Sequence, residues 1–84
     1  MEQVTVKILF FAVSKELAGV SQSTLEVPSR ISFEYLKSKV CENFNLFLIA
    51  NNFVLAVNQN YFESGDIELK NGDELAVIPP LSAG

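Results

Sequence analysis

The stretch from Phe33 to Asn43 limits most strongly how this 84-residue chain can fold, because it carries the main helical pattern. Ser32 can cap its start, and Glu34 lies in the first turn, where the helix dipole favours a carboxylate. Apolar residues recur along it at three- and four-residue steps: Phe33, Leu36, Val40 and Phe44. The pattern gives the helix one apolar stripe, which needs a sheet to cover it.

Segments with strand patterns flank this helix on both sides. We expect strands over residues 4–11, 23–27, 53–57 and 74–78. The connections are expected to hold a short helical turn capped by Ser14 over 14–19, a turn with a second short helix over 45–52, a turn with a short edge pairing at 58–61, and a tight turn at 70–73. The order strand–strand–helix–strand–strand predicts an α+β fold, in which a mixed sheet packs on one helix and the first and last strands lie parallel at its middle.

The first strand is apolar on more than its core face. Alternate residues from Val4 to Phe10 should point toward the helix, which leaves Leu9 and Phe11 on the opposite face. If the first and last strands are parallel neighbours, these two residues lie beside Ala76 and Ile78. The resulting apolar patch is either covered by residues 45–52 or the turn at Tyr61, or it is exposed to a partner protein. The sequence leaves both alternatives open.

The last strand leads into an unusual chain end. Two prolines are followed by small or slender residues: Pro79, Pro80, Leu81, Ser82, Ala83 and Gly84. Proline favours an extended path, so we expect a domain over residues 1–80 and a projecting, narrow tail over 81–84. In this interpretation the chemistry occurs on the carboxylate of Gly84. The alternative is an ordinary frayed terminus, since tails of small residues are common.

Composition excludes several other functions. The net charge is −4 with six scattered basic residues, which disfavours nucleic-acid binding. Histidine is absent and Cys41 is the one cysteine, so an internal disulfide or a metal site of paired ligands cannot form. Cys41 is expected to be a small buried hydrophobe rather than a reactive thiol. No signal peptide is visible and no apolar run is long enough to span a bilayer, so we expect a cytoplasmic protein that binds no membrane and holds no cofactor or metal of its own.

Three groups of residues together resemble a known family. They are Val6–Ala12 followed by Glu16–Gly19, then Ala56-Val57-Asn58 with Tyr61, and Gly72–Ser82. The chain resembles the small subunit of molybdopterin synthase, a ubiquitin-like (β-grasp) sulfur carrier. The Gly-Asp-Glu strand that runs into Pro-Pro is the most specific of these pieces.

The resemblance implies a function for the chain end. An activating enzyme of the ubiquitin-activating type would use ATP to adenylate Gly84, and the acyl-adenylate would then receive sulfur and become a thiocarboxylate. The tail residues 79–83 would enter the large subunit of molybdopterin synthase, where sulfur passes to cyclic pyranopterin monophosphate and forms the dithiolene of molybdopterin. The resemblance also implies a heterotetramer, in which the small subunit is not catalytic alone, and a docking face that includes Phe11, Ile78 and Tyr61.

The chain departs from the family at its penultimate residue. The family usually ends in Gly-Gly, whereas this chain has Ala83 before Gly84. The added methyl group makes a positive φ harder to adopt at that position. Three other functions stay open: a sulfur carrier for thiamine or tRNA thiolation, a ubiquitin-like protein modifier, and a binding domain with an inert tail.

Overall fold

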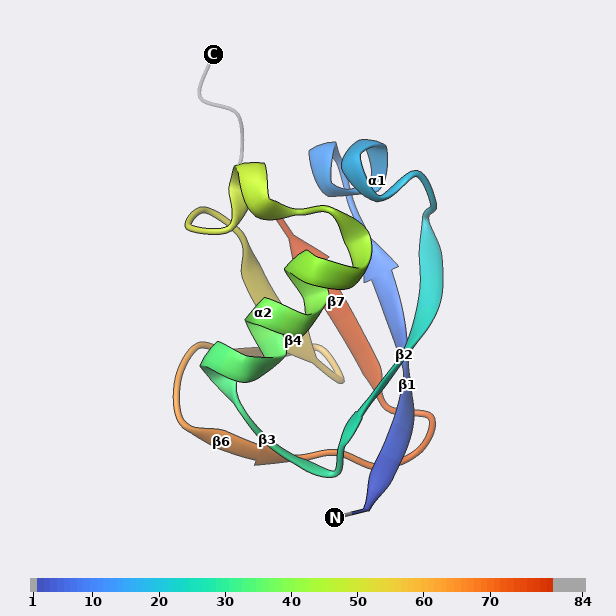
Figure 1. Ribbon diagram of the computed structural model, residues 1–84, viewed down its shortest axis with the longest axis vertical. Coiled ribbons are helices and arrows are strands. Elements are labelled where there is room, and N and C mark those ends of the chain that lie inside the picture. The colour runs from blue at the N-terminus through green and yellow to red at the C-terminus, as the bar shows by residue number, and fades with distance from the viewer. Residues whose placement is uncertain (1, 80–84) are drawn as a thin grey trace.

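The computed structural model describes residues 2–79, which form two small sheets and three helical segments (Figure 1). The strands are β1 (Gln3–Phe10), β2 (Gln22–Pro28), β3 (Arg30–Ser32), β4 (Val54–Val57), β5 (Asn60–Phe62), β6 (Asp66–Glu68) and β7 (Glu74–Ile78). The helices are α1 (Val13–Ala18), α2 (Phe33–Phe44) and the 3₁₀ turn η1 (Phe47–Ile49). Within residues 2–79, no helix is both long and apolar enough to cross a membrane.

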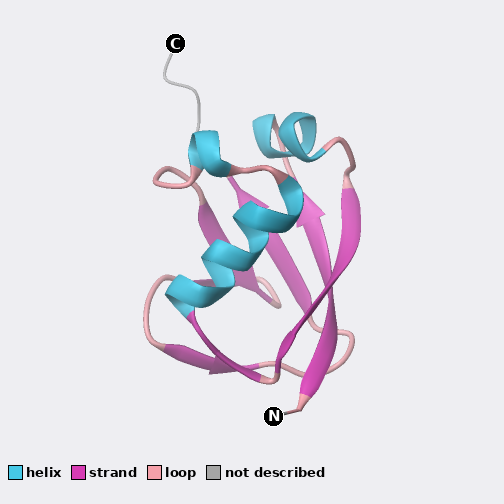
Figure 2. Ribbon diagram, viewed as in Figure 1, coloured by secondary structure: helices cyan, strands magenta, loops and turns pink. Residues whose placement is uncertain are grey.

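The main sheet has five strands in the order β2-β1-β7-β4-β5, and α2 lies across one of its faces (Figure 2). Strands β1 and β7 are parallel neighbours near the middle, and the other pairs of this sheet are antiparallel. A parallel pair needs a long connection, which the helix and the remaining strands supply. The α+β prediction and the parallel central pair are confirmed, and the architecture is that of a β-grasp fold.

The core lies between the sheet and α2. Alternate residues of β1 are almost fully buried, and they are Val4, Val6, Ile8 and Phe10. Leu36 and Val40 of α2 are both 0% exposed and supply the facing stripe. Phe10 and Phe44 close one end of this layer, with ring centroids 4.8 Å apart. The strand period of two and the helix period of three to four therefore meet in one core, as the sequence pattern predicted.

The predicted caps of α2 explain where that helix begins. The Ser32 hydroxyl accepts a hydrogen bond from the Tyr35 backbone N–H at 3.2 Å, so its capping role is confirmed. The helix ends one residue later than predicted, at Phe44, because Asn45 adopts the left-handed conformation with φ 60°. The N–H of Asn45 donates to the Cys41 carbonyl and satisfies one of the free acceptors at the helix end.

The predicted cap of the first short helix is wrong. Helix α1 begins at Val13 with Ala12 as its N-cap, and no side chain caps it. Ser14 lies inside the helix, fully buried, and its hydroxyl bonds to the backbone of Phe11. Gly19 does end the helix as predicted, in the left-handed conformation with φ 79°.

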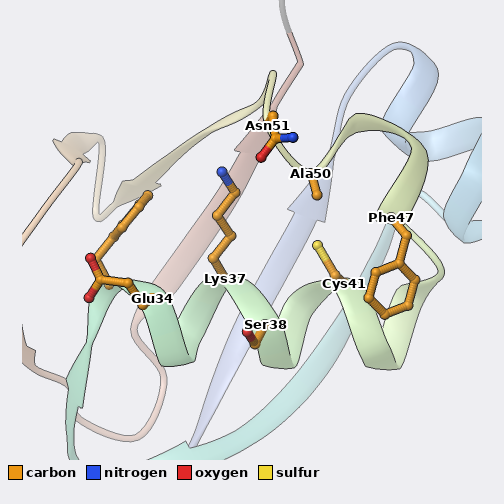
Figure 3. Close-up of a pocket in the computed structure, with 8 residues that line it drawn as sticks. Glu34, Lys37, Ser38, Cys41, Phe47, Ala50 and Asn51 are labelled. Atoms are coloured by element: carbon orange, nitrogen blue, oxygen red, sulfur yellow. The ribbon is translucent and has the colours of Figure 1, made fainter.

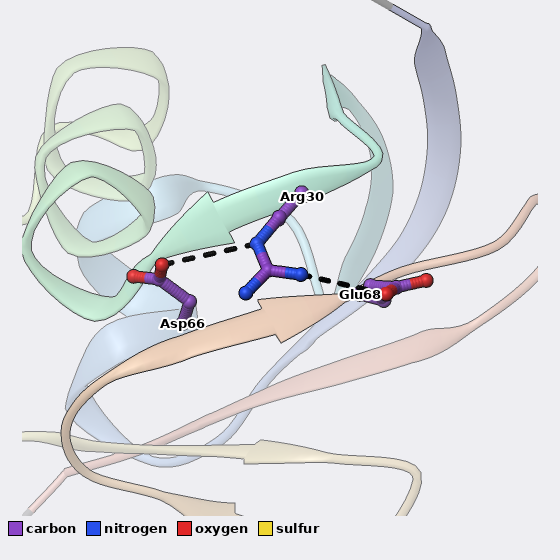
Figure 4. Close-up of polar contacts among 3 residues, drawn as sticks. All are labelled: Arg30, Asp66 and Glu68. Carbon is purple, nitrogen blue, oxygen red and sulfur yellow. Dashed lines mark ion pairs between the residues drawn. The ribbon is translucent and has the colours of Figure 1, made fainter.

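A second sheet, of β3 and β6, was not predicted from the sequence. Both strands are three residues long, and Ile31 at the centre of β3 pairs with Ile67. Arg30 on β3 lies 3.6 Å from Glu68 and 3.9 Å from Asp66 on β6 (Figure 4). All three side chains are more than half exposed, so these ion pairs contribute little to stability. Such short strands lack an alternation long enough to recognise in the sequence.

Candidate functional site

The face of the main sheet that points away from α2 carries a row of apolar side chains across four strands. Leu9 on β1 pairs with Ala76 on β7, Ala76 pairs with Ala56 on β4, and Ala56 pairs with Tyr61 on β5. Two residues farther along β7, Ile78 pairs with Val54. Phe11 follows directly after the end of β1. We call these seven residues the outer patch: Leu9, Phe11, Val54, Ala56, Tyr61, Ala76 and Ile78.

Aromatic contacts identify which face this is. Phe62 stacks edge-on against Phe33 of α2, with ring centroids 5.6 Å apart, so Phe62 faces the helix. Successive strand residues point to opposite faces, and Tyr61 therefore faces away from α2. The same alternation on β7 buries Leu75 and Val77 against the core and leaves Ala76 and Ile78 on the outer side.

The outer patch is open rather than covered by a loop. Tyr61 is 71% exposed, Phe11 is 48% exposed and Val54 is 37% exposed. Leu9, Ala76 and Ile78 are half-buried, and Ala56 is buried among its larger neighbours. Residues 2–79 therefore leave a contiguous apolar surface uncovered, which decides between the two alternatives that the sequence left open.

The outer face becomes polar toward its other end. Thr5 and Lys7 lie below Leu9 on β1, and Lys7 pairs with Glu74 on β7. The apolar residues thus gather where β1 and β7 end, which is also where β7 leads toward residues 80–84. The docking residues predicted from the sequence are brought together at this position.

The predicted tail lies mostly outside the described residues. Pro80, Leu81, Ser82, Ala83 and Gly84 are all in this part, so their predicted path and role stay predictions. Pro79 is described, and its side chain is buried. Pro79 therefore packs into the domain directly after β7, within the range 1–80 expected for the domain, and its predicted entry into the large subunit stays a prediction.

Sequence reasoning missed Val54 and Ala56 in this patch. The apolar run over residues 53–57 predicts a central strand but does not tell which of its residues face away from the helix. The register with β7 shows that alternate residues of this strand reach the outer face. Residues 53–57 are apolar on both faces of the strand, which is the one hint in the sequence. Only the pairing with β7 reveals which of the two faces has no helix over it.

A separate pocket lies on the helix side of the molecule, between α2 and the segment around η1 (Figure 3). The Lys37 Nζ atom lies 5.2 Å from the centre of the Phe53 ring and 5.7 Å from that of Phe33. Cys41 also lines the pocket and is 3% exposed. Burial raises the pKa of the Cys41 thiol, and the nearby Lys37 ammonium offsets this in part. The thiol is therefore protonated near neutral pH and is a poor nucleophile, as predicted.

Within residues 2–79, no three acidic, cysteine or histidine side chains come close enough together to hold a metal ion. The feature that the described part of the chain offers is the outer patch at the end of β7. A mixed five-stranded sheet with one face covered by α2 and an open apolar end on the other face places the chain among ubiquitin-like (β-grasp) proteins.

Comparison with known proteins gives the family. The ThiS family matches residues 8–84, and the chain belongs to it. The molybdopterin synthase sulfur carrier subunit of Anopheles gambiae is 47% identical over 87 residues, which cover 99% of this chain and 96% of that protein. The human protein of the same name is 40% identical and covers 94% of this chain and 93% of its own length. The predicted resemblance to the small subunit of molybdopterin synthase is confirmed.

Solved structures share the fold. The small archaeal modifier protein 1 of Methanosarcina acetivorans superimposes with a TM-score of 0.76 over 100% of both chains, at 22% identity. A complex of subunits 1 and 2 of the molybdopterin-converting factor from Helicobacter pylori contains a chain with a TM-score of 0.70 at 21% identity, covering 96% of this chain and 100% of that chain. At these identities the likeness concerns the fold alone.

Proposed function

We propose that this chain is the sulfur-carrying subunit of a molybdopterin synthase, and that it carries sulfur on the carboxylate of Gly84. The observation that supports this most is the outer patch at the end of β7. This open apolar surface lies beside the strand that leads into residues 80–84, which suits a docking role. The 40–47% identity to molybdopterin synthase sulfur carrier subunits supports the same assignment.

The chemistry requires help from partners. A carboxylate is a poor acyl donor until one of its oxygens becomes a leaving group. In the proposed cycle, an activating enzyme transfers AMP from ATP to the Gly84 carboxylate and releases pyrophosphate. A sulfide equivalent then attacks the acyl carbon and displaces AMP, which leaves a thiocarboxylate.

The thiocarboxylate is then delivered to the large subunit of molybdopterin synthase. Phe11, Tyr61 and Ile78 are proposed to bury their apolar side chains in that subunit, since aromatic anchors carry much of the binding energy of protein interfaces. The large subunit supplies the cations that a charged chain end needs, and cyclic pyranopterin monophosphate accepts the sulfur. Two such transfers complete the dithiolene, within the heterotetramer that the family resemblance implies.

The proposal includes a cytoplasmic location. Cys41 is a free, buried thiol, which suits a reducing compartment. ATP and the activating enzyme are required in the same compartment as the carrier.

An intact-mass measurement tests the carrier function. The full chain is incubated with an activating enzyme of the ubiquitin-activating type, ATP and inorganic sulfide. The expected result is a mass gain that matches replacement of one oxygen by sulfur, located at Gly84 by fragmentation. The matched control is a variant lacking Gly84, which should still dock but gain no sulfur. A full chain that stays unmodified under these conditions contradicts the proposal.

A second measurement assigns the pathway. The sulfur-loaded chain is mixed with the large subunit of molybdopterin synthase and cyclic pyranopterin monophosphate, and pterin dithiolene is detected after oxidation to a fluorescent derivative. Product that depends on the loaded chain supports the assignment. Loading without product would instead favour a carrier for thiamine or tRNA thiolation, and attachment of Gly84 to protein lysines would favour a modifier.

A further inference from the structure

Ser14 stands out because, in the described part of the chain, it is the one polar side chain that is fully buried. Its hydroxyl accepts a hydrogen bond from the Phe11 backbone N–H at 3.0 Å and donates one to the Phe11 carbonyl at 2.6 Å. The same oxygen lies 3.5 Å from the carbonyl of Val77 on β7. A hydroxyl has one proton, and the 2.6 Å bond to the Phe11 carbonyl uses it, so the Val77 carbonyl is a close neighbour of Ser14 rather than a second acceptor.

Ser14 lies between two parts of the molecule that are far apart in sequence, bonded to one and beside the other. Phe11 follows β1 and belongs to the outer patch, whereas Val77 lies near the end of β7, just before residues 79–84. Helix α1, which carries Ser14, lies at the end of the sheet where both strands end (Figure 1). Ser14 thus holds the main chain of Phe11 by two hydrogen bonds and packs beside the end of the last strand.

The turn that Ser14 holds is strained. Ala12 has φ 52° and ψ −129°, a conformation that favours glycine, and the Ser14 N–H donates to the Phe11 carbonyl at 3.1 Å across this turn. Strained residues persist only where the surrounding structure over-determines them, and they cluster at functional sites. The Ser14 hydroxyl is the buried group that supplies this constraint at Phe11.

We propose that Ser14 is a positioning residue for partner docking, which holds the exposed Phe11 side chain in register with the base of the chain end. This inference rests on the proposed function, because it concerns docking to the large subunit of molybdopterin synthase. Ser14 itself is buried and does not touch the partner. It acts through the main chain of Phe11.

The test compares two serine-to-alanine variants in the full chain. Ser14→Ala removes the Phe11 contacts, and Ser32→Ala removes the N-cap bond of α2. The start of α2 and helix α1 lie at opposite ends of the molecule (Figure 1). Both variants lose one hydroxyl that bonds to backbone, so the control matches the chemistry, although Ser14→Ala should lose more stability because Ser14 is buried and makes two bonds to Phe11.

Affinity for the large subunit is measured by titration calorimetry, at a temperature where both variants are folded. We expect Ser14→Ala to weaken binding about tenfold, while Ser32→Ala stays within about twofold of the unmodified chain. In a Phe11→Ala background, Ser14→Ala should cause little further loss, because Ser14 acts through Phe11. Equal affinities of the two serine variants, or full additivity with Phe11→Ala, would overturn the inference.

Amide hydrogen exchange provides a readout that needs no partner. Exchange at the Phe11 N–H should be faster in Ser14→Ala and unchanged in Ser32→Ala, and an unchanged rate in both contradicts the proposed constraint. If Ser14→Ala does not fold, Ser14→Cys takes its place. A thiol fills the space of the hydroxyl but forms weaker hydrogen bonds. An unmodified chain that does not bind the large subunit overturns the proposed function and this inference with it, whereas normal binding with a neutral Ser14 variant overturns this inference alone.

Discussion

The two faces of the main sheet are both apolar near the end of β7, yet one face is buried and the other is exposed. On β1, the helix-facing residues from Val4 to Phe10 are at most 4% exposed. On the other face, at the end of β1, Leu9 is half-buried and Phe11 is 48% exposed. The side chains are of the same kind, so the difference lies in what covers them. One face has α2, and in residues 2–79 nothing covers the other.

The comparison teaches that apolar character on this strand serves two purposes. Burial against α2 stabilises the fold, and the open face is available to a partner. A sheet that faces water normally shows polar residues on its open side. Here the open face is polar at Thr5 and Lys7 but apolar next to the strand ends. Exposed apolar surface of this kind is typical of a protein interface.

The largest expected effect is a difference in stability loss between substitutions at two neighbouring residues of β1. Ile8→Ala should lower the free energy of unfolding by about 2–5 kcal/mol, because Ile8 is 0% exposed and its removal leaves a cavity. Leu9→Ala should cost about 1 kcal/mol, since Leu9 is only half-buried. Urea denaturation of both variants gives the comparison. Equal losses would show that the two faces contribute alike to the fold.

Charge on the open face provides the second test. Ile78→Lys should weaken binding to the large subunit by tenfold or more, because a lysine would enter the centre of an apolar interface. Phe11→Ala should act in the same direction, and circular dichroism should show both variants folded. Thr5→Lys, on the polar end of the same face, is the control and should bind normally. Unfolding of the Ile78 or Phe11 variant would mean that the outer patch belongs to the core.

Alkaline pH should affect the helix side through Cys41. Burial holds the pKa of this thiol above its value in the unfolded chain, so the folded state keeps the proton to higher pH. The contribution is therefore constant below about pH 8.5 and is lost as the pH rises through the folded-state pKa. Cys41→Ala should show a smaller decline in stability above that pH. Disulfide-exchange labelling should also be slower in the folded chain than in urea, and equal rates would contradict the burial.

The smallest expected effect concerns the strained turn beside the outer patch. Ala12→Gly relieves a conformation that costs about 1–3 kcal/mol, but glycine also adds about 0.5–1 kcal/mol of unfolded-state entropy. We therefore expect a net gain of about 0–2.5 kcal/mol, centred on about 1 kcal/mol, in the free energy of unfolding, measured by urea denaturation. Partner affinity should not improve, since the added freedom lies next to Phe11. Ala18→Gly, in a helical position of α1, is the control and should destabilise the chain.

Much of the fold could be predicted because the relevant signals are local. The apolar stripe and Ser32 cap gave α2, and alternation gave β1 and β7. The cap of α1 could not be predicted correctly, since Ser14 is a good N-cap residue by type and its actual partners depend on the turn at Ala12. Strands β3 and β6 were missed because three residues carry no recognisable period.

The amino-acid sequence by itself determined the apolar periodicities, the N-cap of α2, the buried nature of Cys41 and the family resemblance, since each depends on residues close in the chain or on their order along it. The tertiary structure alone decided that Val54 and Ala56 join the outer patch, and that Ser14 bonds to Phe11 beside the end of β7. These outcomes depend on strand register and on contacts between residues up to 63 positions apart. Local preferences carry no information about such pairings. The register of the strands is fixed only when the whole chain has folded and one face of the sheet packs against α2.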